Sequence, residues 1–182
     1  MNKKTRNPEL LILSDLHGLY NNSWIPLYVK ALKNEFEISV YDTCKLAEIE
    51  PNITSKEKRH QAFINGGIGK AVDNLRKHKH HLPFIVGFSI GGTIAWKAVQ
   101  LGMSHKALFA ISATRLRYEH SKPSSPLSLY FGENDPFKPT QQWYSALEVI
   151  PRIIEGSHEF YRHKEAQRQI VSDLLKEKAA LS

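Results

Sequence analysis

Ser89 lies between small residues in the sequence Gly-Phe-Ser-Ile-Gly-Gly (87–92). The apolar run 82–86 precedes it and is typical of a buried strand, and residues 93–99 are typical of a helix. A sharp strand-to-helix turn needs glycines, because a Cβ two residues before or after the serine would collide with crossing backbone. The helix N-terminus also favours developing negative charge. We therefore predict that Ser89 is a nucleophile on a G-x-S-x-G elbow.

A histidine and an acid follow two later strand-like segments. Asp135 follows the apolar run 127–131, and His158 follows the run 149–154. A histidine can take the proton of a serine hydroxyl because imidazole titrates near neutral pH, and a carboxylate then holds the imidazole in the required tautomer. Together with Ser89, these side chains predict a Ser-His-Asp triad for acyl transfer.

Other polar residues offer competing interpretations. Glu133 and Asp15 are alternative acids for His158. The three histidines within 78–81 suggest a metal cluster, but they stand beside lysines and lack carboxylate partners, so a solvated loop is the preferred interpretation. Cys44 is interpreted as a small residue near a strand end, because no histidine accompanies it. We expect neither a metal nor a cofactor.

The elements that must position these residues alternate along the chain. Strands separated by helices imply parallel pairing, right-handed crossovers and helices on both faces of the sheet. We therefore predict a three-layer α/β sandwich with a mostly parallel six-stranded sheet, whose ligand site lies off the carboxyl ends of the strands. The predicted strands are 9–13, 35–41 (near a sheet edge), 82–88, 106–111, 127–131 and 149–154. The predicted helices are 24–33 (capped by Ser23), 57–77, the helix that follows Ser89, 140–147 and 159–178.

Four motifs resemble those of the α/β-hydrolase superfamily, and the resemblance covers nearly all of the chain. Leu-Ile-Leu-Ser-Asp-Leu-His-Gly (11–18) is similar to its first central strand and oxyanion loop, and 87–92 to its elbow. Tyr-Phe-Gly-Glu-Asn-Asp-Pro (130–136) is similar to its acid loop, and Gly-Ser-His-Glu-Phe (156–160) to its histidine loop. The resemblance implies a minimal α/β-hydrolase fold without a cap domain. Residues 112–125 leave no room for a large lid.

The resemblance also implies an oxyanion hole formed by two backbone N–H groups. Ile90, directly after the nucleophile, supplies one of them. If the loop begins at Ser14, Leu16 supplies the second, and if His-Gly (17–18) takes the family's usual place, Leu19 does. We favour Leu16. Losing one such donor typically costs about 2.7–4 kcal/mol of transition-state stabilisation.

Arg115 and Arg117 are the residues most informative about the substrate. They follow the strand 106–111 at the same sheet edge as the serine, and alternation would point both guanidinium groups one way. Such a pair could hold a carboxylate or phosphate. The alternative is that they pair with surface acids such as Glu119 or Glu133. Aromatic residues that could line an acyl pocket are Trp24, Phe88, Tyr118, Phe137 and Trp143.

Composition limits the class of protein. The 182 residues predict a single domain, 1–182. The formal net charge of +7 is spread along the chain, so we do not expect a nucleic-acid partner. No run is long enough for a signal peptide or a membrane span, and the single Cys44 suits a reducing compartment, so we expect a cytoplasmic location. The oligomeric state is left open.

Two functions from different classes follow. The first is a small lidless serine hydrolase of esterase or thioesterase type, which cleaves a small-molecule acyl ester or thioester, including anionic ones, through an acyl-enzyme. Its preference for esters is implied by the resemblance. The alternative is a non-catalytic α/β-hydrolase-like protein that uses the pocket or the basic surface to bind a ligand.

Overall fold

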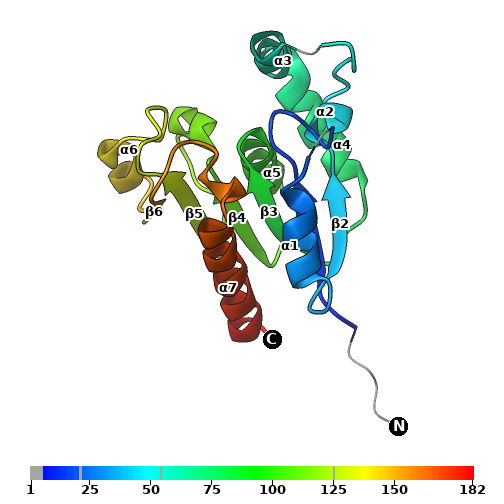
Figure 1. The fold of residues 1–182 in the computed structure, drawn as a ribbon, viewed down its shortest axis with the longest axis vertical. Helices are drawn as coiled ribbons and strands as arrows, with labels where there is room; N and C mark the ends of the chain where they lie inside the picture. Colours follow the sequence, from blue (N-terminus) through cyan, green and yellow to red (C-terminus); the bar gives the residue numbers. More distant parts are fainter. Residues whose placement is uncertain (1–5, 21, 54, 125) are drawn as a thin grey trace.

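A computed structural model describes residues 6–20, 22–53, 55–124 and 126–182 (Figure 1). Its six strands form one all-parallel sheet in the order β2-β1-β3-β4-β5-β6. This confirms the predicted six-stranded sheet. The strand predicted near an edge, 35–41, corresponds to β2, which lies at one edge. The strands are β1 (Glu9–Leu13), β2 (Glu37–Tyr41), β3 (Phe84–Phe88), β4 (Ala107–Ile111), β5 (Leu127–Gly132) and β6 (Arg152–Ile154).

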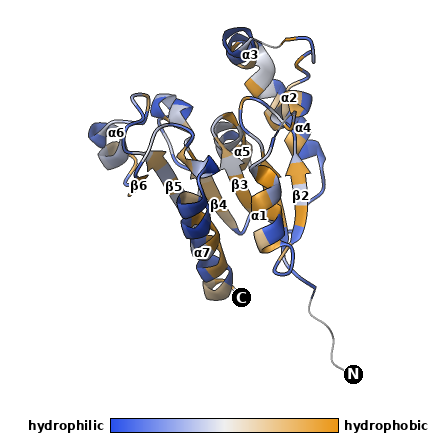
Figure 2. Ribbon diagram, in the orientation of Figure 1, coloured by the Kyte–Doolittle hydropathy of each residue, from blue (hydrophilic) through white to orange (hydrophobic). Residues whose placement is uncertain are grey.

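Helices cover both faces of the sheet, as predicted (Figure 1). Helices α1 (Ile25–Leu32) and α7 (Lys164–Ala180) pack on one face, where Leu10 and Ile12 of β1 point. Leu11 and Leu13 point to the other face, because successive side chains of a strand alternate. That face is covered by α4 (Ile68–Lys77), α5 (Ile90–Gln100) and α6 (Gln141–Ala146). In Figure 2 the strands are coloured mainly as hydrophobic, in agreement with a core on both faces.

The predicted helix 57–77 is instead two helices that meet at a bend. Helix α3 (Lys56–Ala62) is joined to α4 by a π-helical turn, η1 (Phe63–Gly67). Within that turn Gly66 has a φ of 113°, which is unfavourable for residues with a side chain. The bend carries α3 beyond the carboxyl ends of the strands (Figure 1).

Two helix N-termini also differ from prediction. The Ile25 N–H at the start of α1 donates to Asn22 Oδ1 at 2.9 Å, so Asn22 rather than Ser23 satisfies it. The last helix begins at Lys164 and not at 159, because Phe160 and Tyr161 are buried in the core through a short 3₁₀ turn, η3 (Phe160–Arg162).

The strand order reverses between β1 and β3, since β2 lies beyond β1 and β4 lies beyond β3. In open α/β sheets ligands bind at such a point, off the carboxyl ends of the strands. Ser89 follows β3 there, beside the loop that leaves β1. Within the described ranges, no helix is long and apolar enough to cross a bilayer.

Candidate active site

Ser89 occupies a strained turn between β3 and α5. Its φ of 52° and ψ of −116° lie outside the regions that a serine ordinarily adopts. A Cβ on Gly87 would lie 2.6 Å from the carbonyl oxygen of Gly91, and a Cβ on Gly91 would collide with the carbonyl oxygen of Ser14. The Ser89 N–H donates to the Ile111 carbonyl at 2.7 Å. The glycines are therefore required at the positions predicted.

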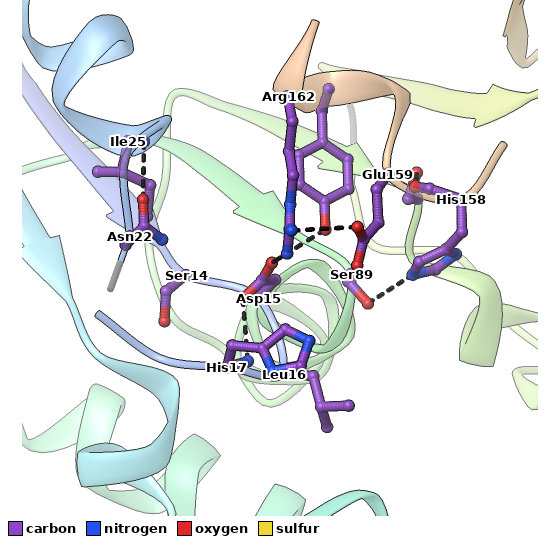
Figure 3. A network of polar contacts seen from close by, with 12 residues as sticks. Ser14, Asp15, Leu16, His17, Asn22, Ile25, Ser89, His158, Glu159 and Arg162 are labelled. Atoms are coloured by element: carbon purple, nitrogen blue, oxygen red, sulfur yellow. Dashed lines mark hydrogen bonds and ion pairs between the residues drawn. The ribbon is translucent and has the colours of Figure 1, made fainter. Parts of the chain in front are cut away.

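The three predicted triad residues form one chain of hydrogen bonds. Ser89 Oγ lies 2.8 Å from His158 Nε2, and His158 Nδ1 lies 2.6 Å from Asp135 Oδ2. Figure 3 shows the imidazole of His158 directed at the serine hydroxyl. The Asp135 carboxylate is fully buried, whereas the His158 side chain is 31% exposed. The serine and histidine thus face a space that a substrate can enter.

The environment of Asp135 keeps its carboxyl group ionised. Burial alone would raise the pKa of Asp135, but the hydrogen bond with His158 and the Phe137 N–H, which donates to Oδ1 at 2.9 Å, lower it. The charges of His158 and Lys138 act in the same direction, and the pKa lies below its ordinary value. An ionised carboxylate holds the Nδ1 proton of the imidazole and leaves Nε2 as the acceptor for the serine proton.

The two alternative acids do not contact His158. Asp15 Oδ2 accepts hydrogen bonds from Arg162 Nη2 at 2.7 Å and from the Tyr161 hydroxyl at 3.1 Å, in a buried network (Figure 3). Glu133 is exposed at the surface. Asp135 is therefore the acid in contact with the imidazole.

The histidine loop is held by groups that the sequence did not reveal. Ser112, the first residue after β4, donates from its hydroxyl to the His158 carbonyl at 2.6 Å. The Asn134 N–H of the acid loop donates to the Gly156 carbonyl at 3.0 Å. The position of Ser112 at a strand end was the available signal, because strand ends meet at one edge of the sheet.

Two backbone N–H groups beside Ser89 have no acceptor within the described part of the chain. They belong to Leu16 and Ile90, which line the same pocket as Ser89. The Leu19 N–H, the alternative donor, is already used by Asp42 Oδ2 at 3.0 Å. The Leu16 N–H is thus available to an acceptor in the pocket, whereas the Leu19 N–H is not.

The turn after β2 fixes the loop that carries Leu16. The Thr43 hydroxyl donates to the Asp15 carbonyl at 2.6 Å, and the Cys44 thiol donates to the Leu16 carbonyl at 3.4 Å. Burial, with smaller effects of Asp42 and other neighbours, raises the pKa of the Cys44 thiol to about 11. The thiol is therefore protonated at neutral pH and is a poor nucleophile.

The histidine run requires a correction. His80 does have a carboxylate partner, because its Nδ1 lies 2.7 Å from Glu9 Oε1, and its side chain is only 6% exposed. Its Nε2 lies 3.3 Å from the Tyr41 hydroxyl. The start of β1 brings Glu9 to this loop, a contact between residues far apart in the sequence. Among the described residues, no group of three or more His, Cys, Asp or Glu side chains is arranged to hold a metal ion.

Ser89 opens into a pocket of about 590 Å³. Of the predicted substrate-binding residues, Arg115, Arg117 and Phe137 line it. Trp24 does not line it, so that prediction is wrong. The centroid of the Trp24 ring lies 4.6 Å from that of Phe88, and Trp24 lines a separate pocket of about 820 Å³. The full lining of the pocket at Ser89 consists of Leu16, Lys56, Glu57, His60, Ser89, Ile90, Thr93, Thr114, Arg115, Arg117, Asp135, Pro136, Phe137, Ser157, His158 and Glu159.

None of the other three predicted aromatic residues, Phe88, Tyr118 and Trp143, lines this pocket, so that part of the prediction is wrong. Tyr118 is exposed beside the two arginines, Phe88 is fully buried, and Trp143 donates from its indole N–H to the Glu119 carbonyl at 2.9 Å. The sequence also missed the contribution of α3, whose Lys56 and His60 reach the pocket. The paired glycines at 66–67 were the only sign that the helix bends toward it.

Comparison with known proteins identifies the fold. No protein-family model and no curated protein matches the chain. Among solved structures, it resembles alpha/beta hydrolase domain-containing protein 10 from mouse, with a TM-score of 0.70 and 14% identity over 100% of this chain and 93% of that one.

Two further solved structures match at 14% identity and a TM-score of 0.60. One is an esterase from Pyrococcus furiosus, over 93% of this chain and 83% of the esterase. The other is BorB, a type II thioesterase of the borrelidin biosynthetic cluster, over 95% of this chain and 92% of BorB. The protein therefore has the α/β-hydrolase fold.

Proposed function

We propose that the protein is a serine hydrolase that cleaves carboxylic esters or thioesters. The observation that carries the proposal is the continuous hydrogen-bonded chain from Ser89 through His158 to the buried Asp135. Similarity to an esterase and a thioesterase adds support at the level of the fold.

In this mechanism Ser89 Oγ attacks the acyl carbon while His158 Nε2 takes the hydroxyl proton. The tetrahedral oxyanion accepts hydrogen bonds from the Ile90 N–H at the N-terminus of α5 and from the Leu16 N–H of the loop that follows β1. His158 then gives its proton to the departing alcohol or thiol, and an acyl-enzyme is left. Water, deprotonated by His158, attacks that ester, and the acid product leaves as Ser89 recovers its proton.

The substrate would be a small molecule, because the pocket of about 590 Å³ is of the size that holds such ligands. A cytoplasmic location remains part of the proposal, supported by the single cysteine of the chain, Cys44, which the structure holds as a free thiol.

Labelling with a fluorophosphonate probe tests the nucleophile. We expect wild type to be labelled at Ser89 and Ser89→Ala not to be, and 4-nitrophenyl esters of short acids to be hydrolysed by wild type. Asp135→Asn should lower kcat by roughly 10⁴-fold, because the imidazole loses its tautomer control. If wild type resists labelling, or Ser89→Ala labels equally, the alternative of a non-catalytic binding protein takes its place.

A further inference from the structure

Two guanidinium groups form one wall of the pocket that contains Ser89. Arg115 and Arg117 both belong to η2 (Thr114–Tyr118), the 3₁₀ turn after β4. Their Cζ atoms lie 5.1 and 4.4 Å from the centroid of the Tyr118 ring, a distance at which cations are attracted to an aromatic face. One tyrosine thus supports both side chains.

Arg117 is fixed further by neutral acceptors. Its Nη1 donates to the Thr114 carbonyl at 2.8 Å and to the Phe137 carbonyl at 3.3 Å, and its Nη2 donates to the Tyr118 hydroxyl at 2.9 Å. A guanidinium has five N–H donors, so part of this group is still available to a ligand. Because neutral oxygens hold it, its orientation is set while its charge is not neutralised.

The acids nearby have other partners. Glu119, two residues after Arg117 in the sequence, pairs with Lys97 at 2.7 Å. Glu159 pairs with Arg162 at 3.1 Å. In the part of the chain that the structure describes, neither Arg115 nor Arg117 forms an ion pair with a carboxylate. The geometry therefore does not support the alternative in which Arg115 and Arg117 pair with surface acids.

The positive charge of Arg115 and Arg117 acts on another residue that lines the pocket. Burial lowers the pKa of His60, and the charges of Arg115, Arg117 and Lys56 lower it further. His60 and Lys56 belong to α3 and line the same pocket as η2. The acids that line the pocket are engaged elsewhere: Glu57 accepts from the Ser55 hydroxyl, Asp135 pairs with His158 and Glu159 pairs with Arg162. The two guanidinium groups are thus available to an anion.

We propose that the natural substrate carries an anionic oxygen group, a carboxylate or a phosphate, that Arg115 and Arg117 bind while the scissile carbonyl lies at Ser89. This rests on the hydrolase function proposed above and narrows its substrate class. Planar guanidinium groups bind carboxylates and phosphates through paired hydrogen bonds, so they position the ester as well as attract it.

Two matched pairs of probes test the charge and its location. Mono-4-nitrophenyl glutarate and 4-nitrophenyl pentanoate differ in charge on the acyl side, and 4-acetoxybenzoate and its methyl ester differ on the leaving-group side. We expect kcat/KM to favour the anionic member of at least one pair by roughly ten- to hundredfold, because the free energy of a hydrogen bond to a charged group corresponds to a factor of that size. The preference should shrink as salt is added.

Variants locate the effect. Arg115→Gln and Arg117→Gln should each reduce the anionic-to-neutral ratio of kcat/KM, and Arg117→Lys should keep part of it. Arg168→Gln, which removes an exposed charge on α7 outside the pocket, should keep the wild-type ratio. Thermal melting of each variant identifies any that fail to fold.

The outcomes separate this inference from the hydrolase proposal. Absence of Ser89 labelling and of ester hydrolysis overturns both. Labelling of Ser89 with equal kcat/KM for charged and neutral members of both pairs overturns the anionic substrate alone. If no probe turns over but Ser89 is labelled, protection from labelling decides: monomethyl glutarate should protect better than methyl pentanoate, and equal protection refutes the inference.

Discussion

Asp15 and Arg162 form an ion pair that ties the loop after β1 to the loop after β6. Arg162 Nη2 lies 2.7 Å from Asp15 Oδ2, and the Asp15 side chain is 2% exposed (Figure 3). Asp15 Oδ1 also accepts from the His17 N–H at 2.9 Å. The pair thus joins the loop that bears Leu16 to the segment that follows His158.

Asp15→Asn should lower both stability and turnover. It removes the charge of the buried partner of Arg162, which keeps only the more exposed Glu159 at 3.1 Å. Breaking a buried ion pair costs about 3 kcal/mol, and we expect a loss up to that size. Displacement of the Leu16 N–H should reduce kcat more than it changes KM, because the oxyanion forms only in the transition state. Urea unfolding and steady-state kinetics measure the two effects.

Glu37→Gln is the control for that prediction. It breaks the exposed pair between Arg6 and Glu37, which lies at the far end of β2 from the site, and it should leave both quantities unchanged. Equal effects of the two substitutions would mean that the Asp15 pair is no more than a surface contact.

The lowered pKa of Asp135 should appear in the pH dependence of stability. A carboxyl whose folded pKa lies below the unfolded value of about 3.9 stabilises the native state above that pH, and the contribution is lost as the pH falls through the folded value. The free energies of unfolding of wild type and Asp135→Asn, measured in urea between pH 6 and 2, should therefore converge at the acid end of that range. Curves that stay parallel would contradict the shift.

Loss of activity on acidification should precede that loss of stability. A protonated imidazole cannot accept the proton of Ser89, so kcat/KM should fall while Asp135 is still ionised and the chain is still folded. Parallel measurements of kcat/KM and far-UV circular dichroism distinguish the two steps. A flat kcat/KM down to the unfolding transition would exclude His158 as the base.

Two glycines on the bent helix should respond oppositely to alanine. Gly66→Ala should destabilise the protein by more than about 1 kcal/mol, because its φ of 113° is unfavourable for alanine. Gly69→Ala, about one turn later in α4 at a position where an added Cβ meets no atom within 4 Å, should stabilise it by about 0.4–1 kcal/mol. Thermal melting of both variants gives the comparison. Two shifts of the same sign would argue against the bend.

Replacing each of two buried threonines by valine should have different effects on the stability of the protein. The Thr43 hydroxyl bonds the Asp15 carbonyl and Ser14 Oγ, so Thr43→Val should cost about 1–3 kcal/mol. The Thr93 hydroxyl is buried in the pocket wall without a partner in the described part of the chain, so Thr93→Val should be neutral or stabilising. Calorimetry decides, and an equal loss in both variants would show a hidden partner for Thr93.

The sheet and the proximity of Ser89, His158 and Asp135 were predictable because their signals are local. Each strand is a short apolar run, and Ser89, Asp135 and His158 each follow one directly. Parallel topology alone then brings strand ends together. The contact between Ser89 and His158 could therefore be predicted without knowing how the side chains pack.

The contacts that the sequence did not predict join residues distant along the chain. Asp15 with Arg162 and Glu9 with His80 depend on how loops and helices pack, and no local pattern records such pairing. Trp24 was misplaced because an aromatic residue near a strand end fits core and pocket equally. The arginine pair was predicted, but its support by Tyr118 emerged only in three dimensions.

The helix that closes one side of the pocket, α3, has no buried side chain. Its residues therefore contribute little to the folding free energy, while Lys56 and His60 line the pocket beside Ser89. Substitutions there can alter which molecules are accepted without endangering the scaffold. If the proposed hydrolase function holds, α3 is the element on which ligand preference can be altered at the least cost in stability.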